Sequence, residues 1–191
     1  MPDTSDIRNG LAIVHNGDIW TVVEFLHVKP GKGGAFVRTK LKNVKTGRVL
    51  DVTFRAGEKI ETARVERRPH QFLYEDDLGL HFMNTETYEQ ISLPRDLVPG
   101  REYIKEGGVI DVLVHAETEQ PLATEIAKSV ELVVAHTEPG VRGDTATGAT
   151  KPATLESGAV VNVPLFINEG DVIRVNTDTG AYVTRVSTAD R

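Results

Sequence analysis

The residue with the clearest chemical potential in this sequence is Lys32, at the centre of the segment Pro30-Gly31-Lys32-Gly33-Gly34. Three glycines leave Lys32 as the only side chain of any reach, so a loop here would display its ammonium group at an exposed tip. A lysine presented in this way could enter a narrow anionic space, and it would be accessible to a modifying enzyme. The alternative is an ordinary hairpin loop that contains a lysine, and composition alone does not separate the two.

Basic side chains gather around this segment. No acidic residue lies between Glu24 and Asp51, whereas seven cations do, namely Lys29, Lys32, Arg38, Lys40, Lys42, Lys45 and Arg48. Arg38, Lys40 and Lys42 are spaced two apart, which places them on one face of a β-strand. A solvated surface normally mixes the two signs of charge. We therefore interpret a set of four cations as an RNA-binding face, with a merely solvated strand as the alternative: Lys29, Arg38, Lys40 and Lys42.

A second segment, residues 138–150, is long for a compact β domain and contains no apolar anchors. Loops of this kind are usually functional or disordered. Gly143 and Gly148 have the spacing of a phosphate-binding loop, but Ala149-Thr150 stands where such a loop requires a lysine and a hydroxyl residue. Nucleotide hydrolysis is therefore unsupported, and we expect a recognition loop that offers backbone and short polar groups to a partner.

The remaining residue types argue against an active site. The chain has no cysteine, which excludes disulfides, thiolate metal sites and cysteine nucleophiles. No Gly-x-Ser-x-Gly or Ser/His/Asp arrangement occurs. Six histidines are scattered singly, without metal-ligand spacing: His15, His27, His70, His81, His115 and His136. We expect no catalytic residue, no metal and no cofactor, and therefore a protein that is not an enzyme.

The total charge points away from nucleic acid, but its distribution does not. With 22 Lys+Arg and 28 Asp+Glu among 191 residues, the formal net charge is −6. Residues 1–64 carry 11 basic and 7 acidic side chains, a net of +4, while residues 65–191 carry 11 and 21, a net of −10. The first part can approach RNA, and the acidic remainder limits indiscriminate binding. No apolar run approaches the ~20 residues that span a bilayer, and no signal segment opens the chain, so we expect a cytoplasmic protein without a membrane partner.

Short strands must position these residues, because helical periodicity persists for no more than one or two turns anywhere in the chain. Asn16-Gly17 is the strongest hairpin signal, since both turn positions need positive φ. One helical turn is expected within residues 94–103. The predicted strands are 11–15, 18–28, 35–44, 49–54, 71–74, 80–83, 88–93, 109–116, 123–126, 130–136, 159–167, 171–176 and 181–186.

Strand-sized pieces at this spacing predict an all-β protein of three consecutive small β-barrel domains. Residues 1–64 have the short strands and tight turns of an SH3-like barrel. Residues 65–127 and 128–191 have the pattern of five-stranded barrels, for which the OB-fold is the commonest form. Three such domains in a row would make an elongated body.

Several motifs along the chain resemble those of a known family. The signature of bacterial elongation factor P is matched by Lys151-Pro152-Ala153, Gly158, Val161, Val163-Pro164, Ile167 and Gly170. The segment 30–35 resembles that family's tip loop, and Gly57-Glu58-Lys59 and residues 139–145 also stand where the family has them. The resemblance covers essentially the whole chain, and its motifs are specific in combination.

The resemblance implies a KOW-type N-terminal barrel followed by two OB-folds, arranged as an L that mimics transfer RNA. It implies a monomeric factor that binds the ribosome between the peptidyl and exit sites and contacts the ribosomal RNA of both subunits. There the factor would stabilise the P-site peptidyl-tRNA and stimulate peptide-bond formation at consecutive prolines, with the ribosome as the enzyme. Lys32 would reach toward the CCA end, and a lysine-modifying enzyme could extend it; rhamnosylation, which requires arginine, is not expected.

By the same resemblance, Arg142, Gly143, Asp144 and Thr145 belong to a loop of the third domain near the mRNA at the exit-site codon. The sequence leaves open which group, if any, modifies Lys32. It also leaves two other interpretations open: a paralogue of the family with a different specialism, and a generic RNA-binding β module without a role in peptidyl transfer.

Overall fold

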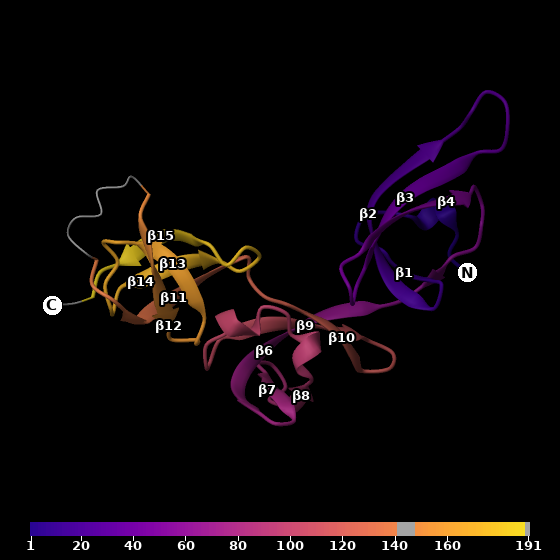
Figure 1. Ribbon diagram of the computed structural model, residues 1–191. Coiled ribbons are helices and arrows are strands. Elements are labelled where there is room, and N and C mark those ends of the chain that lie inside the picture. The colour runs from indigo at the N-terminus through magenta and orange to yellow at the C-terminus, as the bar shows by residue number, and fades with distance from the viewer. Residues whose placement is uncertain (141–147, 190–191) are drawn as a thin grey trace. The chain divides into compact units, whose positions relative to one another are not determined.

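The computed structural model describes residues 1–140 and 148–189, and in them it shows an all-β protein built on three five-stranded sheets (Figure 1). This confirms the predicted fold class. The chain divides into two compact units, one of residues 1–68 with 112–123 and the other of residues 69–111 with 124–191. The domain bounds at 64 and 127 remain predictions.

The first sheet is a meander in which chain neighbours pair in the order β4-β3-β2-β1, with β5 paired to the free side of β1. Its strands are β1 (Ala12–His15), β2 (Asp18–Val28), β3 (Phe36–Asn43), β4 (Val49–Arg55) and β5 (Glu61–Thr62). Asn16 and Gly17 have φ of 52° and 80°, as the hairpin prediction requires. One face of the sheet packs into a core: Ile7, Ile13, Trp20, Val22, Val37, Leu41, Phe54 and Ile60.

The second sheet has the order β10-β9-β6-β7-β8. Its strands are β6 (Val65–Asp76), β7 (Gly79–Asn84), β8 (Gln90–Leu93), β9 (Val109–His115) and β10 (Gln120–Glu125). The helical turn expected within residues 94–103 is instead two 3-10 turns, Arg95–Leu97 and Arg101–Tyr103. Gly100, in the left-handed region at φ 76°, separates the two turns and prevents one continuous helix.

The third sheet has the order β13-β12-β11-β14-β15. Its strands are β11 (Ser129–Thr137), β12 (Thr150–Leu155), β13 (Val160–Pro164), β14 (Val172–Asn176) and β15 (Tyr182–Ser187). Alternate residues of these strands fill a core, in which Val163, Ile167, Ile173 and Val175 are completely buried. Sequence analysis missed β12, because Lys151 and Pro152 interrupt the apolar pattern expected of a strand.

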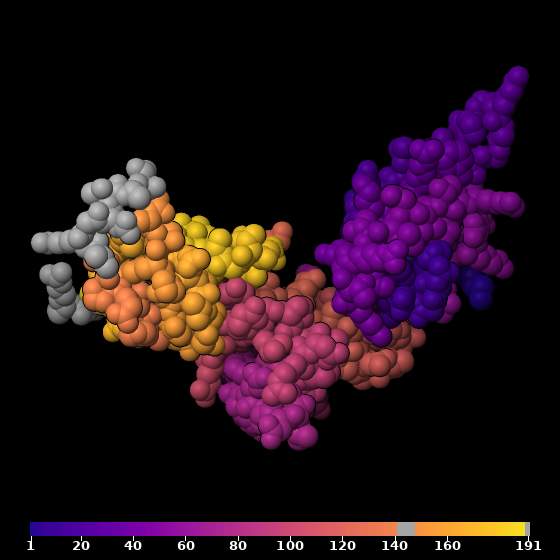
Figure 2. All heavy atoms as spheres, in the orientation of Figure 1, coloured from indigo at the N-terminus to yellow at the C-terminus, as the bar shows by residue number. Residues whose placement is uncertain are grey.

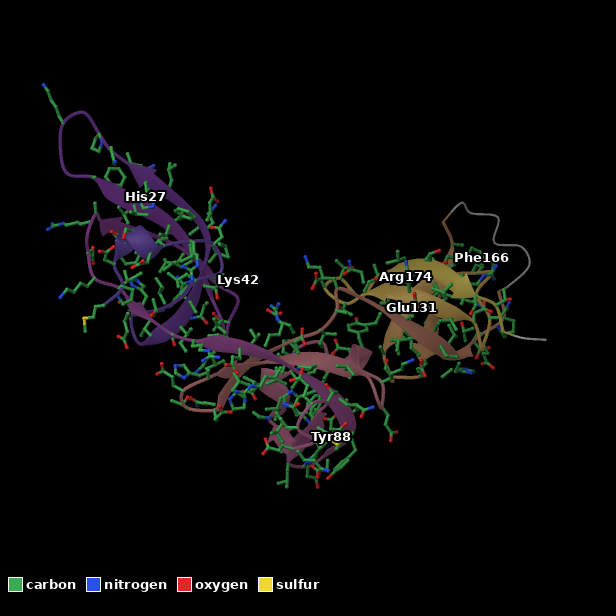
Figure 3. The ribbon with its side chains drawn as sticks, turned by 180° about the vertical axis from the view of Figure 1, so that it is seen from behind. His27, Lys42, Tyr88, Glu131, Phe166 and Arg174 are labelled. Atoms are coloured by element: carbon green, nitrogen blue, oxygen red, sulfur yellow. The ribbon has the colours of Figure 1, made fainter. Side chains whose placement is uncertain are left out.

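One turn recurs in all three sheets. The asparagine that ends β3, β7 or β14 accepts hydrogen bonds from the backbone N–H groups two and three residues later: Asn43, Asn84 and Asn176. The residue four positions after the asparagine has positive φ in each case, at Gly47, Tyr88 and Gly180. Tyr88 is the one of these three residues that is not glycine, and it is 71% exposed on the second sheet (Figure 3). A tyrosine in this backbone region is strained where glycine is not.

Candidate functional site

The loop that carries Lys32 stands at the end of a paired ribbon. β2 and β3 pair from Trp20↔Asn43 as far as Val28↔Phe36, so residues 29–35 form the connection beyond the last pair. This tip loop projects away from the rest of its sheet, and the space-filling view shows it as a narrow extension (Figures 1 and 2). Residues 29–34 are all exposed, Lys32 among them. The geometry agrees with the predicted display of an ammonium group at a tip.

The glycines of the tip loop differ in why they are needed. Gly33 has φ of 109°, which side-chain-bearing residues rarely adopt. Gly31 and Gly34 have ordinary φ, and a Cβ atom built on either would meet nothing within 4 Å. Neither backbone conformation nor packing within the described chain therefore requires glycine at 31 or 34.

The predicted basic strand face exists. In β3, Val37, Thr39 and Leu41 are buried, while Arg38 and Lys42 are exposed on the opposite side. Lys40 lies between them on the same outer face, half-buried. Register continues this face onto the neighbouring strands, because Arg38 is opposite Leu26 of β2 and Thr53 of β4. Lys29 is exposed at the start of the tip loop.

The positive charge of this outer face is uneven. The Lys40 ammonium lies 3.0 Å from a carboxylate oxygen of Glu24, and this hydrogen bond and the carboxylate's charge raise the pKa of Lys40. Asp51 is the register partner of Lys40 on β4. The two acids that bound the cationic segment in sequence therefore both meet its central lysine in space. Within residues 1–140 and 148–189, no ion pair balances the cations at the two ends of the face, Arg38 and Lys42.

Sequence analysis missed the apolar part of this face. Leu26 is 60% exposed next to Arg38, whose guanidinium carbon lies 5.7 Å from the centroid of the Phe36 ring. An open groove of about 420 Å³ crosses the face, lined by Glu24, Phe25, Leu26, Arg38, Thr39, Lys40, Asp51, Val52 and Thr53. Figure 3 shows His27 toward the tip end of the ribbon and Lys42 toward the other end. The exposure of Leu26 could have been predicted from the hairpin pattern, because Leu26 lies opposite Arg38, which is on the outer face.

The other predicted site, Arg142, Gly143, Asp144 and Thr145, lies outside the described residues. Side chains contact the described chain on either side of this segment. The Lys151 ammonium donates to the backbone carbonyl oxygen of Glu138 at 2.6 Å. Glu169 accepts from the Thr137 N–H at 3.1 Å and lies 2.6 Å from Nδ1 of His136, and these contacts hold the pKa of Glu169 below its ordinary value.

Two of the other histidines lie in the second sheet, away from the tip loop and the basic face. His70 is 3% exposed, and Nε2 of His81 lies 2.9 Å from a carboxylate oxygen of Asp76 at the β6–β7 turn. Among residues 1–140 and 148–189, no group of three or more His, Cys, Asp or Glu side chains is placed to hold a metal ion. Within the same residues, no helix is long and apolar enough to cross a membrane.

Family models match the chain in three consecutive pieces. Residues 3–60 match the elongation factor P KOW-like domain, residues 65–123 match the elongation factor P OB domain, and residues 130–185 match the elongation factor P C-terminal domain. The three pieces correspond to the three sheets. They support the predicted order of one KOW-type domain followed by two further β domains.

Relatives with known names match over nearly the full length. Elongation factor P of Salinibacter ruber is 62% identical over 189 residues, covering 99% of this chain and 98% of that protein. Elongation factor P of Christiangramia forsetii is 59% identical, covering 97% and 99%. Elongation factor P of Moorella thermoacetica is 55% identical, covering 97% and 100%.

A solved structure shares the fold of part of the chain. Eukaryotic translation initiation factor 5A from Methanococcus jannaschii superposes with a TM-score of 0.51 at 22% identity. The match covers 66% of this chain and 90% of that one.

Proposed function

The chain belongs to the elongation factor P family of translation factors, and on this premise we propose that it binds the ribosome between the peptidyl and exit sites and speeds peptide-bond formation at consecutive prolines. A translation elongation factor acts on the ribosome, so the cations of the first sheet can bind ribosomal RNA, which is a polyanion. Family membership alone does not give the position on the ribosome or the step that the protein speeds, and these two are what we propose.

One observation carries this proposal. Gly31 and Gly34 flank Lys32 at positions where neither φ nor neighbouring atoms demand glycine. The tip loop is thinner than its own fold requires, which suits entry into a confined space. The RNA-lined space around the CCA end of a P-site tRNA is of that kind, and a cation at the tip can contact phosphates and 2′-hydroxyl groups without reading a base sequence.

The mechanism that follows is one of positioning. Proline is a sterically restricted nucleophile, and a peptidyl-tRNA that carries prolines can slip from productive geometry. A rigid support at the CCA end restores the alignment of the reacting groups, and ångström-scale alignment can be worth several kcal/mol of the barrier. The chain supplies no reacting group in this scheme, so the ribosome performs the chemistry. The ammonium of Lys32 is also accessible to a lysine-modifying enzyme, which would lengthen the tip.

The outer face of β3 supports the same docking. Arg38 and Lys42 place unbalanced charge on the ribbon below the tip, and Lys29 adds a cation at its start. We assign to these residues the sequence-independent part of RNA binding, which depends on phosphate contacts and weakens with added salt. Residues 142–145 are assigned to contacts near the exit-site codon.

The test is Lys32→Ala in a reconstituted translation assay with a reporter that contains consecutive prolines. We expect the stimulation of peptide-bond formation to be lost, because the support at the CCA end is gone. The thermal unfolding midpoint should stay unchanged, since Lys32 is exposed in a loop whose residues 29–34 are all exposed. Lys45→Ala is the matched control, because Lys45 is an exposed lysine in the turn between β3 and β4, at the other end of β3 from the tip loop. Undiminished stimulation by Lys32→Ala would refute the tip assignment.

A further inference from the structure

The recurring asparagine turn has one sequence pattern, Asn-x-x-Thr followed by the residue of positive φ. Its copies begin at the last residue of β3, β7 and β14 and comprise residues 43–47, 84–88 and 176–180. In each copy, the fifth residue donates its backbone N–H to the carbonyl oxygen of the asparagine at 2.8–2.9 Å, and its φ lies between 62° and 71°. The three turns therefore require the same backbone conformation at the fifth position.

Glycine fills this position twice and tyrosine once. Gly47 and Gly180 adopt positive φ without strain, whereas Tyr88 brings a Cβ atom and a bulky ring into a region that such residues avoid. The turn itself would be better served by glycine at 88. The tyrosine side chain therefore needs an explanation other than the backbone.

Packing within the chain does not explain Tyr88 either. The residue is 71% exposed, and within residues 1–140 and 148–189 its ring contacts neither another ring nor a cation (Figure 3). The turn closes the hairpin of β7 and β8, and β8 is the edge strand of the second sheet. A strained residue that presents an aromatic ring to solvent beside a sheet edge is well placed to contact another molecule.

The charges around Tyr88 indicate the kind of molecule. Glu86 and Glu89 flank it, both are exposed, and neither has an ion-pair partner in the part of the chain that the structure describes. Residues 65–127 carry 5 basic and 13 acidic side chains, a net of −8. This charge repels the phosphates of RNA and attracts lysine and arginine side chains. The face of a tyrosine ring also attracts an ammonium or guanidinium group.

We propose that Tyr88, Glu86 and Glu89 form a contact site for a basic protein surface of the ribosome, with an arginine or lysine side chain of that surface on the tyrosine ring. This inference rests on the proposed function, because it takes the ribosome as the partner. The site and the basic face of the first sheet have opposite charge, so they bind different components, protein and RNA respectively. The contact adds to affinity and leaves the reacting groups to the tip loop.

The first experiment measures the affinity of full-length variants for purified ribosomes. Tyr88→Gly should bind about tenfold more weakly than the wild type, whereas Tyr88→Phe should bind as the wild type does, because phenylalanine keeps the ring. Leu78 is 79% exposed in the turn at the other end of β7, so Leu78→Ala is the matched control and should bind as the wild type does. Equal binding by Tyr88→Gly and the wild type would overturn the contact site.

Two further readouts separate a contact from a structural role. The thermal unfolding midpoint of Tyr88→Gly should rise or stay within about 2 °C of the wild type, because relief of strain offsets the flexibility of glycine in the unfolded chain. In the proline reporter assay, Tyr88→Gly should need about ten times more factor for half-maximal stimulation and should keep the maximal rate. A larger fall in the midpoint, or a lost maximal rate at saturation, would overturn the inference.

The second experiment distinguishes a protein partner from RNA. The double substitution Glu86→Gln and Glu89→Gln should weaken ribosome binding, and this loss should shrink as salt is added, because the carboxylates attract basic side chains. With an RNA partner, the removal of two negative charges would strengthen binding instead. Photocrosslinking from Tyr88→p-benzoylphenylalanine on purified ribosomes should give an adduct with a lysine- or arginine-rich peptide. An adduct with RNA, or no adduct, would overturn the proposed partner.

The failures of the two proposals are distinguishable. A wild-type chain that does not bind purified ribosomes overturns the proposed function, and this inference with it. A wild-type chain that binds and stimulates the reporter, while Tyr88→Gly matches it in both assays, overturns the contact site alone.

Discussion

The tip loop and the connection between β11 and β12 both join neighbouring antiparallel strands, yet the chain holds them in different ways. Pairing carries β2 and β3 up to the tip loop, and beyond the last pair Gly31 and Gly34 meet no atoms. At the start of the second connection, the buried Lys151 ammonium binds the Glu138 carbonyl and Gly140 packs against Leu165. The strands beneath it position the tip loop, whereas residues 138 and 140 are held by contacts with β12 and with the residue that follows β13.

This difference predicts which substitutions alter activity without altering folding stability. Substitutions at positions 31, 32 and 34 of the tip loop should change only what a partner meets, because these residues are exposed and a Cβ atom at Gly31 or Gly34 would meet nothing within 4 Å. Substitutions at the described start of the second connection, such as Gly140→Ala, should change the packing of the third sheet. Matched substitutions in the two regions therefore test this difference.

The largest effect is expected from charge reversal on the first sheet, compared with charge reversal on the third sheet. The double substitution Arg38→Glu and Lys42→Glu should weaken ribosome binding by about tenfold or more and flatten its salt dependence, because both cations lie unbalanced on the outer face. Arg174 of β14 lies 2.6 Å from Glu131, and both are labelled in Figure 3. Arg174→Glu should therefore have little effect on affinity. Titrations with ribosomes at several salt concentrations measure the affinity and its salt dependence for both variants. Equal losses of affinity would show that the first sheet has no special role in RNA binding.

A smaller effect is expected from alanine in place of one glycine in each region. Gly140→Ala should lower the free energy of unfolding by about 1–3 kcal/mol, since its Cβ atom would meet Leu165. Gly31→Ala should leave the free energy of unfolding unchanged and should reduce the maximal rate in the proline reporter assay. Urea unfolding measures the first quantity. Equal destabilisation by the two substitutions would mean that the tip loop is held by packing after all.

The smallest effect is expected from acid, and only at the second connection. The Thr137 N–H and His136 keep the folded-state pKa of Glu169 below the ordinary 4.5. A lowered carboxyl pKa adds stability that is complete above pH 4.5 and is lost as the pH falls through the folded-state value. The wild-type chain should therefore unfold at a higher temperature than Glu169→Gln at neutral pH, by at most about 2 °C, and this difference should vanish in acid. A difference that persists at pH 2 would exclude the ionised carboxylate as its cause.

Much of the first sheet could be predicted from the sequence, because there local signals and tertiary packing agree. β2 has the predicted bounds, Asn16-Gly17 forms the predicted turn, and Arg38, Lys40 and Lys42 share the predicted face. The pairing of Lys40 with Glu24 could not be predicted, because the two lie 16 residues apart and meet only across the β2–β3 register.

The strands of the second and third sheets were harder to predict from the sequence, because polar residues occupy several strand positions. β6 begins at Val65, six residues before the predicted start, since its first half is rich in charged residues and contains Pro69. β12 was missed because its inward position 151 holds a lysine whose partner, the Glu138 carbonyl, comes from another strand's end. Tyr88 has a backbone conformation that its residue type does not suggest. In each case the deciding interaction is remote in sequence or specific to the fold.

The meander of the first sheet bears on how the chain folds during its synthesis. β1 to β4 each pair with their neighbour in the chain, so each hairpin closes a short loop at low entropic cost. A sheet of such local contacts folds quickly compared with one that depends on remote pairings. The four-stranded ribbon that carries the tip loop can therefore assemble before residues 61 and 62 arrive to pair with β1. By contrast, the middle of the third sheet joins β11 to β14, so its core must wait for strands made some 35 residues later.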